Sequence, residues 1–202
     1  HCWQVLGRPG RAEPLHRSAV TLARRYAKTE QLDRSLNNLG EALRRLKRPE
    51  EALAALAESE RIARRSGRHA DALLVVRNRA LSLLELRRYD EAQRLLRLAQ
   101  LEARRRRLWD HCPRIMGTLA NVAWHQGHGT AAVRLYQRAL LSARSRRHKD
   151  EEVELALNLA KVLTWERRPG AALAVLRRYQ SAATARLQLV EVLRAVAELL
   201  ET

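Results

Sequence analysis

The sequence predicts an all-α fold built from antiparallel helical hairpins that stack on one another. Shifting the chain by 40 residues superimposes it on itself, with alanine recurring in two columns. Within one period, Leu36, Leu39, Leu43 and Leu46 form the stripe of an amphipathic helix. Small residues at fixed phases let helix backbones approach closely where repeats pack. The two columns are Ala12, Ala52, Ala92, Ala132 and Ala172, and Ala23, Ala63, Ala103, Ala143 and Ala183.

A turn position divides each period into two helices. Its column often holds proline, which suits the first turn of a helix because the missing N–H costs no hydrogen bond there. Acidic residues follow two of these turns and complement the positive end of the helix dipole. Second helices are therefore expected at 52–65, 92–107, 132–147 and 172 to about 181, each after a first helix. The column reads Pro9, Pro49, Tyr89, Gly129 and Pro169.

The segment NNLGEALRRLKRPEEALAALAESERIARR, residues 37–65, resembles a tetratricopeptide repeat. Leu39 and Gly40 occupy the family's Leu-Gly pair, and Ala52 and Leu56 its Ala and Phe positions. Three further copies keep the pattern, with Ala80, Ala120 and Ala160 in place of the glycine. The resemblance implies a right-handed α-α superhelix. The long period is similar to variants in spindle-orientation adaptors and in bacterial regulatory ATPases and transcriptional activators.

We expect one continuous solenoid domain over residues 1–202, because no Gly-, Ser- or Pro-rich linker interrupts the repeat. His1 aligns with Glu41 in the middle of a first helix, so we expect the chain to be a fragment of a larger protein. An amphipathic stretch at 185–201 is either a capping helix or half of another repeat. The expected divisions are a partial repeat at 1–29 and full repeats at 30–69, 70–109, 110–149 and 150–183.

The chain is strongly basic, with a net charge of +17 from 39 lysines and arginines against 22 acidic residues. Such a field attracts acidic partners. One column of arginines, which we call the basic edge, falls at the ends of the second helices, and two interpretations fit it. Either it follows the phosphates of a nucleic acid, or each arginine complements the negative end of a helix dipole. The basic edge comprises Arg24, Arg64, Arg104 and Arg144.

The sequence offers no catalytic constellation and no metal or cofactor site. His125 and His128 flank a predicted turn without further zinc ligands, so we interpret them as turn and surface histidines. Gly-rich phosphate loops and nucleophile elbows are absent from the sequence. Apolar runs fall short of the roughly 18 to 20 residues of a membrane span. Two cysteines, Cys2 and Cys112, fit a reducing compartment. We therefore expect a non-enzymatic, cytoplasmic protein.

The resemblance also implies a binding groove lined by the first helices. One column of that groove reads Asn38, Asn78, Thr118 and Asn158. An amide side chain both donates and accepts, so such a ladder suits the backbone of an extended peptide. The alternative is that these residues serve contacts between helices. The groove positions are Arg34, Asn37, Asn38, Arg45, Arg77, Asn78, Arg114, Thr118, Asn121, Trp124, Asn158, Lys161 and Trp165.

Two tryptophans and several arginines define the expected partner. Trp124 and Trp165 lie about one repeat apart and either anchor an apolar side chain of a partner or belong to the core. The groove arginines form a positive rim, which favours an acidic peptide. We expect a protein- or peptide-binding scaffold or sensor within a larger intracellular, bacterial regulator. The alternatives are a basic solenoid that binds nucleic acid and a self-association module.

Overall fold

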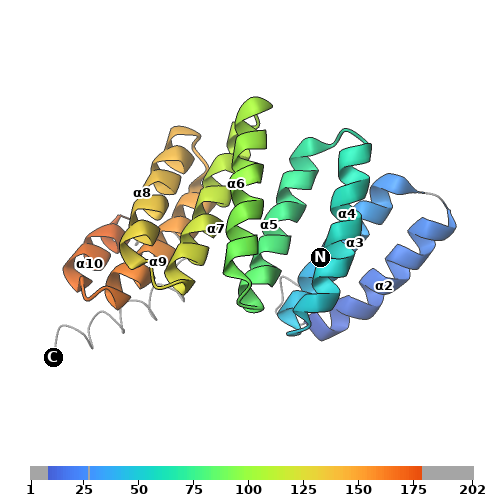
Figure 1. Cartoon of the computed structure of the whole chain (residues 1–202), viewed down its shortest axis with the longest axis horizontal. Coiled ribbons are helices and arrows are strands. Elements are labelled where there is room, and N and C mark those ends of the chain that lie inside the picture. The colour runs from blue at the N-terminus through green and yellow to red at the C-terminus, as the bar shows by residue number, and fades with distance from the viewer. Residues whose placement is uncertain (1–8, 27, 179–202) are drawn as a thin grey trace. The chain divides into compact units, whose positions relative to one another are not determined.

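The computed structural model describes residues 9–26 and 28–178, and its helices are labelled in Figure 1. Regular structure in this part of the chain consists of α-helices and one short 3-10 helix, η1, as the predicted all-α fold requires. The elements are α2 (Pro9–Arg25), α3 (Thr29–Arg45), α4 (Pro49–Arg65), α5 (His69–Glu85), α6 (Tyr89–Arg105), η1 (Trp109–His111), α7 (Cys112–His125), α8 (Gly129–Ser145), α9 (Lys149–Trp165) and α10 (Pro169–Arg177).

The helices follow the 40-residue period closely. The second helices, α2, α4, α6, α8 and α10, each begin at the predicted turn column. Glu50 and Glu51 lie in the first turn of α4, and Asp90 and Glu91 in that of α6, where they complement the helix dipole. The first helices α3, α5 and α9 begin midway between, so a helix of 17 residues starts every 20 residues.

The helix α7 is shorter than the other first helices because of a proline. The spacing places a helix start at Trp109, but a proline at Pro113 would clash with the Trp109 carbonyl and leave it without a hydrogen bond in an α-helix. The chain forms η1 over Trp109–His111 instead, and α7 begins at Cys112 with Pro113 in its first turn. The cost is one turn of α-helix.

The helix α4 ends at Arg65 as predicted, but α6 and α8 end two residues earlier than the sequence predicts. Residues 106 and 107 were expected in α6 and residues 146 and 147 in α8, but these helices end at Arg105 and Ser145. The reason is the turn: Arg107 and Arg147 have positive φ angles of 56° and 59°, which no right-handed helix contains. The last part of the predicted helix 172–181, together with Ala183 and the stretch 185–201, lies outside the described residues.

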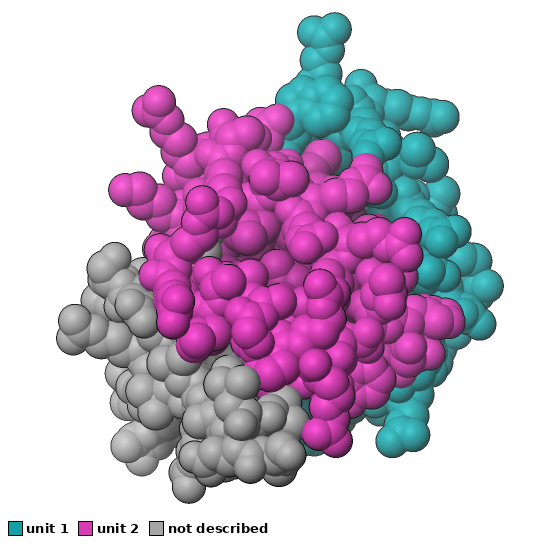
Figure 2. Space-filling model, turned by 90° about the vertical axis from the view of Figure 1, so that its left-hand side faces the viewer, with its two compact units in different colours: residues 1–111 teal, residues 112–202 magenta. Residues whose placement is uncertain are grey.

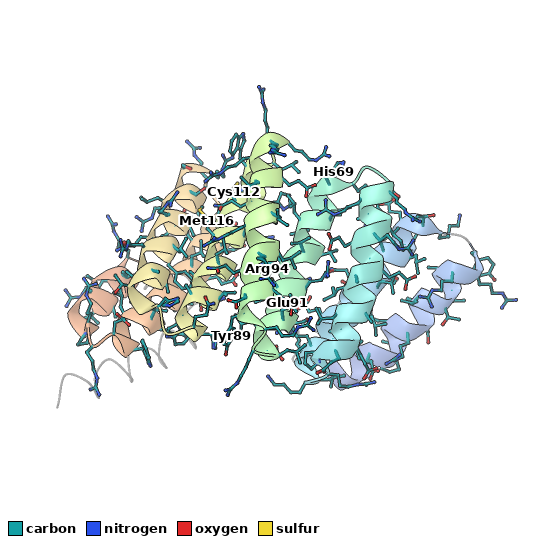
Figure 3. The ribbon with its side chains drawn as sticks, in the orientation of Figure 1. His69, Tyr89, Glu91, Arg94, Cys112 and Met116 are labelled. Carbon is teal, nitrogen blue, oxygen red and sulfur yellow. The ribbon has the colours of Figure 1, made fainter. Side chains whose placement is uncertain are left out.

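Each turn has the hydrogen bonds of a Schellman motif. After α3, the Lys47 N–H donates to the Arg44 carbonyl and the Arg48 N–H to the Leu43 carbonyl, both at 3.0 Å. The same pair of bonds recurs after α4, α5, α6, α7, α8 and α9. Consecutive turns lie at opposite ends of the helices, as His69 at the start of α5 and Tyr89 at the start of α6 show in Figure 3. Identical turns every 20 residues thus produce the antiparallel hairpins.

The chain divides into two compact units, residues 1–111 and 112–202, coloured separately in Figure 2. Unit 1 holds α2 to α6 with η1, and unit 2 holds α7 to α10. Within each unit, every α-helix packs against the next one along the chain, and first helices also contact each other, α3 with α5 and α7 with α9. We call the surface formed by these neighbouring first helices the first-helix face of each unit.

The alanine columns are buried in the described residues. Ala52, Ala92, Ala132 and Ala172 have no exposed surface, and Ala63, Ala103 and Ala143 have none either. Around them, unit 1 packs a core of leucines and valines that includes Leu36, Leu43 and Leu56. Gly40 allows a close approach of α3 to α4, since a Cβ atom there would lie 2.5 Å from Leu56 Cγ. The repeated small residues therefore mark helix contacts, as predicted.

Candidate functional site

The first-helix face of unit 1 is held together by polar side chains. The Asn78 amide on α5 donates to Asn37 Oδ1 on α3 at 2.9 Å. Arg44 donates to Glu85 at 2.7 Å and makes a second bridge between the same two helices. Two of the predicted groove residues, Asn37 and Asn78, therefore also have a structural duty. Asn38, one position further along α3, is partly exposed on the helix.

The arginines of this face have carboxylate neighbours within their own helix. Arg34 pairs with Glu30 at 2.9 Å and Arg45 with Glu41 at 2.6 Å, both one helical turn apart. Arg77 on α5 is partly buried. The positive rim predicted from the arginines is therefore partly compensated in unit 1, because Arg34 and Arg45 already lie against carboxylates.

In unit 2, two predicted groove residues are used inside the fold. Thr118 is only 2% exposed, and its hydroxyl donates to the Arg114 carbonyl one turn earlier at 2.9 Å. Asn121 accepts a hydrogen bond from the Tyr136 hydroxyl of α8. Burial raises the pKa of Tyr136, and the nearby Glu154 raises it further, so this phenol remains a donor. Thr118 and Asn121 thus stabilise α7 and its packing on α8.

On the first-helix face of unit 2, α9 presents three side chains to solvent. Asn158, Lys161 and Trp165 are spaced by three and four residues, so they share one side of the helix. Lys161 is exposed, Asn158 is partly exposed, and Trp165 has 57% of its surface exposed. Trp124 on α7 is less accessible, and its ring lies 5.2 Å from the His125 ring. Of the two tryptophans, Trp165 presents the larger apolar surface to a partner.

Arg114 on α7 also belongs to this face and lies near a buried carboxylate. Its Nε is 3.6 Å from Glu151 on α9, and His148 Nδ1 lies 3.2 Å from the same carboxylate. Burial raises the pKa of Glu151, while Arg114 and His148 act in the opposite direction. The arginine therefore compensates a buried charge in addition to contributing to the exposed surface.

The basic edge is largely paired with carboxylates of the same chain. Arg24 lies 2.6 Å from Glu58, and Arg64 lies 2.8 Å from Glu60 and 2.7 Å from Glu102. Glu60 is also bonded by Arg79 of α5. The pair of Arg24 with Glu58 joins α2 to α4, and the pair of Arg64 with Glu102 joins α4 to α6. These two pairs therefore connect successive second helices.

Two arginines of the basic edge differ from this pattern. Arg144 lies 3.7 Å from Glu152 of α9, and Arg104 is exposed in the last turn of α6. The sequence pattern indicates that all four arginines lie at helix ends, but it does not indicate which carboxylates they pair with. Two of those partners, Glu58 and Glu102, stand 34 and 38 residues away from Arg24 and Arg64. Their signal in the sequence is an acid nearly one period after the arginine.

The tetratricopeptide repeat family matches the chain over residues 2–65, 31–106 and 114–145. These matches include more than half of the sequence, so the chain belongs to the tetratricopeptide repeat family. A repeat domain of this family is a protein-interaction scaffold, and its fold is typically non-catalytic. No curated protein matches the chain.

Solved structures with the same fold come from different settings. BtubC (BKLC) from P. vanneervenii is 19% identical with a TM-score of 0.67, over 91% of this chain and 76% of that one. A putative kinesin light chain with nearly identical TPR-like repeats from Podosopora anserina is 18% identical with a TM-score of 0.64, over 92% and 91%. The Rap conjugation gene regulator of plasmid pLS20, solved with the Phr* peptide, is 18% identical with a TM-score of 0.69, over 89% and 52%. At such identities the likeness concerns the fold.

Among residues 9–26 and 28–178, no helix combines the length and the apolar character that crossing a membrane requires. In the same residues, no three His, Cys, Asp or Glu side chains gather as a metal ion would require. Cys112 is buried at the start of α7.

Proposed function

We propose that this chain binds an extended segment of a partner protein along its first helices, as the non-catalytic interaction arm of a larger regulator. The observation that carries the proposal is the exposed indole of Trp165, in line with Asn158 and Lys161 on α9. Leaving an indole in water is unfavourable, and tryptophan is enriched among the residues that dominate binding energies. An amide and an ammonium beside it can bind peptide backbone and a carboxylate.

The contacts of the fold assign different duties to the other groove residues. Thr118 and Asn121 hold α7, and the bond between Asn37 and Asn78 holds α3 against α5. We propose Asn158, Lys161, Trp165 and Trp124 as the main contact in unit 2, and the partly exposed Asn38 and Arg77 as the contact in unit 1. A preference for acidic partners rests on the exposed Lys161, while Arg34 and Arg45 lie against Glu30 and Glu41.

One protein of the same fold supports a peptide as the partner. The Rap regulator shares this fold and was solved with the Phr* peptide. Its role as a conjugation gene regulator also supports a bacterial, cytoplasmic regulatory setting for this chain. The ion pairs of Arg24 and Arg64 support a stabilising duty for the basic edge in place of nucleic-acid binding.

The test is a selection of peptides from a random display library on the full chain, followed by titration calorimetry with variants. Trp165→Ala should weaken the selected peptide by about 2 kcal/mol or more, roughly thirtyfold, as expected for an aromatic anchor. Asn158→Ala should cost less, about 0.5 to 1.5 kcal/mol. The control is Arg138→Ala, which removes an exposed side chain from α8 and should leave the affinity unchanged. Equal losses in Trp165→Ala and Arg138→Ala would contradict the proposal.

A further inference from the structure

Two grooves lie between second helices, one in each unit, at the same position of the repeat. The α2/α4 groove in unit 1 has a volume of about 440 Å³ and lies above α3. The α8/α10 groove in unit 2 has a volume of about 550 Å³ and lies above α9. Residues of the second groove stand three periods after those of the first, so Arg24 corresponds to Arg144, Leu39 to Leu159 and Glu58 to Arg178. The two grooves can therefore be compared position by position.

Ion pairs span the α2/α4 groove. Arg24 of α2 lies 2.6 Å from Glu58 of α4, and Arg17 of α2 lies 3.3 Å from Glu51 of α4. All four residues line the groove. The two walls thus satisfy each other's charges, and an incoming charged segment would have to displace these pairs.

The α8/α10 groove has lost both acids. Ala171 stands where Glu51 stands in unit 1, and Arg178 stands where Glu58 stands. The arginine of the opposite wall is kept as Arg144, which pairs with Glu152 of α9 at 3.7 Å. Arg144 on α8 and exposed Arg178 after α10 therefore line the same groove with the same sign of charge. Like charges on facing walls favour an acidic occupant.

The same groove is also more apolar than its counterpart. Leu140, Leu141 and Val175 take the places of Val20, Thr21 and Ala55. On the floor, Ala156 takes the place of Leu36, which leaves more room between the walls. Leu141 has 63% of its surface exposed although it lines the groove. Covering such side chains is favourable by about 25 cal/mol per Å² of apolar surface.

We propose that the α8/α10 groove docks an acidic amphipathic helix of a partner protein. The groove lies between α8 and α10, two second helices with the same chain direction, and a groove between helices suits an amphipathic helix with anchors at i, i+4 and i+7. Leucine-like anchors cover Leu141 and Val175, and glutamates on either side meet Arg144 and Arg178. This surface lies on the second helices, so the inference does not depend on binding at the first-helix face.

The probe for this site is a labelled synthetic helical peptide with leucines at i, i+4 and i+7 and glutamates between them. Its twin carries lysine at every glutamate. Fluorescence anisotropy with the full chain should show the glutamate peptide binding at least about tenfold more tightly than the lysine twin. Arg178→Glu restores the arrangement of Arg24 and Glu58, and it should weaken the glutamate peptide about tenfold or more while keeping the melting temperature.

The matched control is Arg177→Glu, which changes the net charge equally at the neighbouring exposed position outside the groove. It should shift the affinity by about twofold at most, because only the long-range field changes. Leu141→Gln serves as a second variant and should weaken binding with all charges kept.

Four results would overturn the docking proposal. Equal binding of the two peptides, or equal effects of Arg178→Glu and Arg177→Glu, would exclude a site built on Arg178. Loss of binding in Trp165→Ala with no loss in Leu141→Gln would move the peptide to the first-helix face. A dimer in sedimentation that Arg178→Glu converts to a monomer would make a second copy of this chain the occupant.

Discussion

The turns offer a sharp test of how the backbone limits stability. Gly67 and Gly127 have φ angles of 70° and 82°, which glycine adopts freely. Arg87, with a φ of 58°, occupies the equivalent position after α5 despite its Cβ atom. A residue with a Cβ atom in this left-handed region costs roughly 1 to 2 kcal/mol, whereas glycine costs about 0.5 to 1 kcal/mol in lost chain freedom. Arg87→Gly should therefore stabilise the fold by about 0.5 to 1 kcal/mol.

The assay is thermal unfolding followed by circular dichroism. For a chain of this length, about 1 kcal/mol corresponds to a rise in Tm of roughly 2 to 4 °C. Arg87→Ala is the control, since it removes the same charge but keeps the Cβ atom, and it should raise the Tm less. Gly67→Ala should lower the stability by about 1 kcal/mol, and nothing lies within 4 Å of the added Cβ, so the loss measures the backbone alone.

Equal melting temperatures of Arg87→Gly and Arg87→Ala would contradict a backbone effect, because removal of the charge would then explain any gain. A melting temperature of Gly67→Ala equal to that of the parent chain would contradict it as well. Combining Arg87→Gly with the same change at Arg107 and Arg167 should give nearly additive gains, since these turns are far apart in the sequence and share no hydrogen bond.

Four further outcomes are expected. Ala92→Leu and Ala132→Leu should each overpack a fully buried contact and lower the unfolding free energy in urea by about 1 to 3 kcal/mol; unchanged midpoints would contradict the packing. Glu60→Ala removes the carboxylate that Arg64 and Arg79 share and should cost about 1 to 3 kcal/mol by the same assay, whereas a gain would show the ion network to be dispensable. Since burial raises the pKa of Glu151, stability from this group is present below its ordinary pKa of 4.5 and lost as the pH rises through the raised value; Glu151→Gln should therefore gain on the parent chain as the pH rises, and parallel pH profiles would contradict this. Any binding of DNA should be weak and fall steeply with salt, by an anisotropy titration at two ionic strengths, and sequence-selective binding that survives physiological salt would restore the nucleic-acid interpretation.

Much of the helical architecture could be predicted because it depends on residues that recur at fixed positions in each repeat. The column of Pro49, Tyr89 and Gly129 fixes where second helices begin, and the alanine columns fix which sides of the helices touch. The ends of α6 and α8 were predicted two residues too late, because arginine in a left-handed turn leaves no signal as clear as glycine does. The 3-10 turn before α7 follows from Pro113, a constraint that a repeat comparison does not weigh.

The candidate site was less predictable, because side-chain pairing depends on distances between repeats. The register placed Thr118 in line with Asn38 and Asn158, but its hydroxyl donates to its own helix and is buried. Likewise, Glu58, which binds Arg24, and Glu102, which binds Arg64, stand almost a full period away, beyond any local pattern. Composition gave the excess of positive charge, but only the packed helices distinguish paired arginines such as Arg24 from Arg178 in a groove without acids.

The central claim is that a partner segment lies along the first helices, and photo-cross-linking with a library-selected peptide tests it most directly. The full chain would carry p-benzoylphenylalanine in place of Lys161 on α9 or, in a second variant, in place of Arg138 on α8; both positions are exposed. The account predicts an efficient cross-link to the peptide from position 161 and background levels from position 138. A cross-link from position 138 alone would contradict it and place the partner on the second helices.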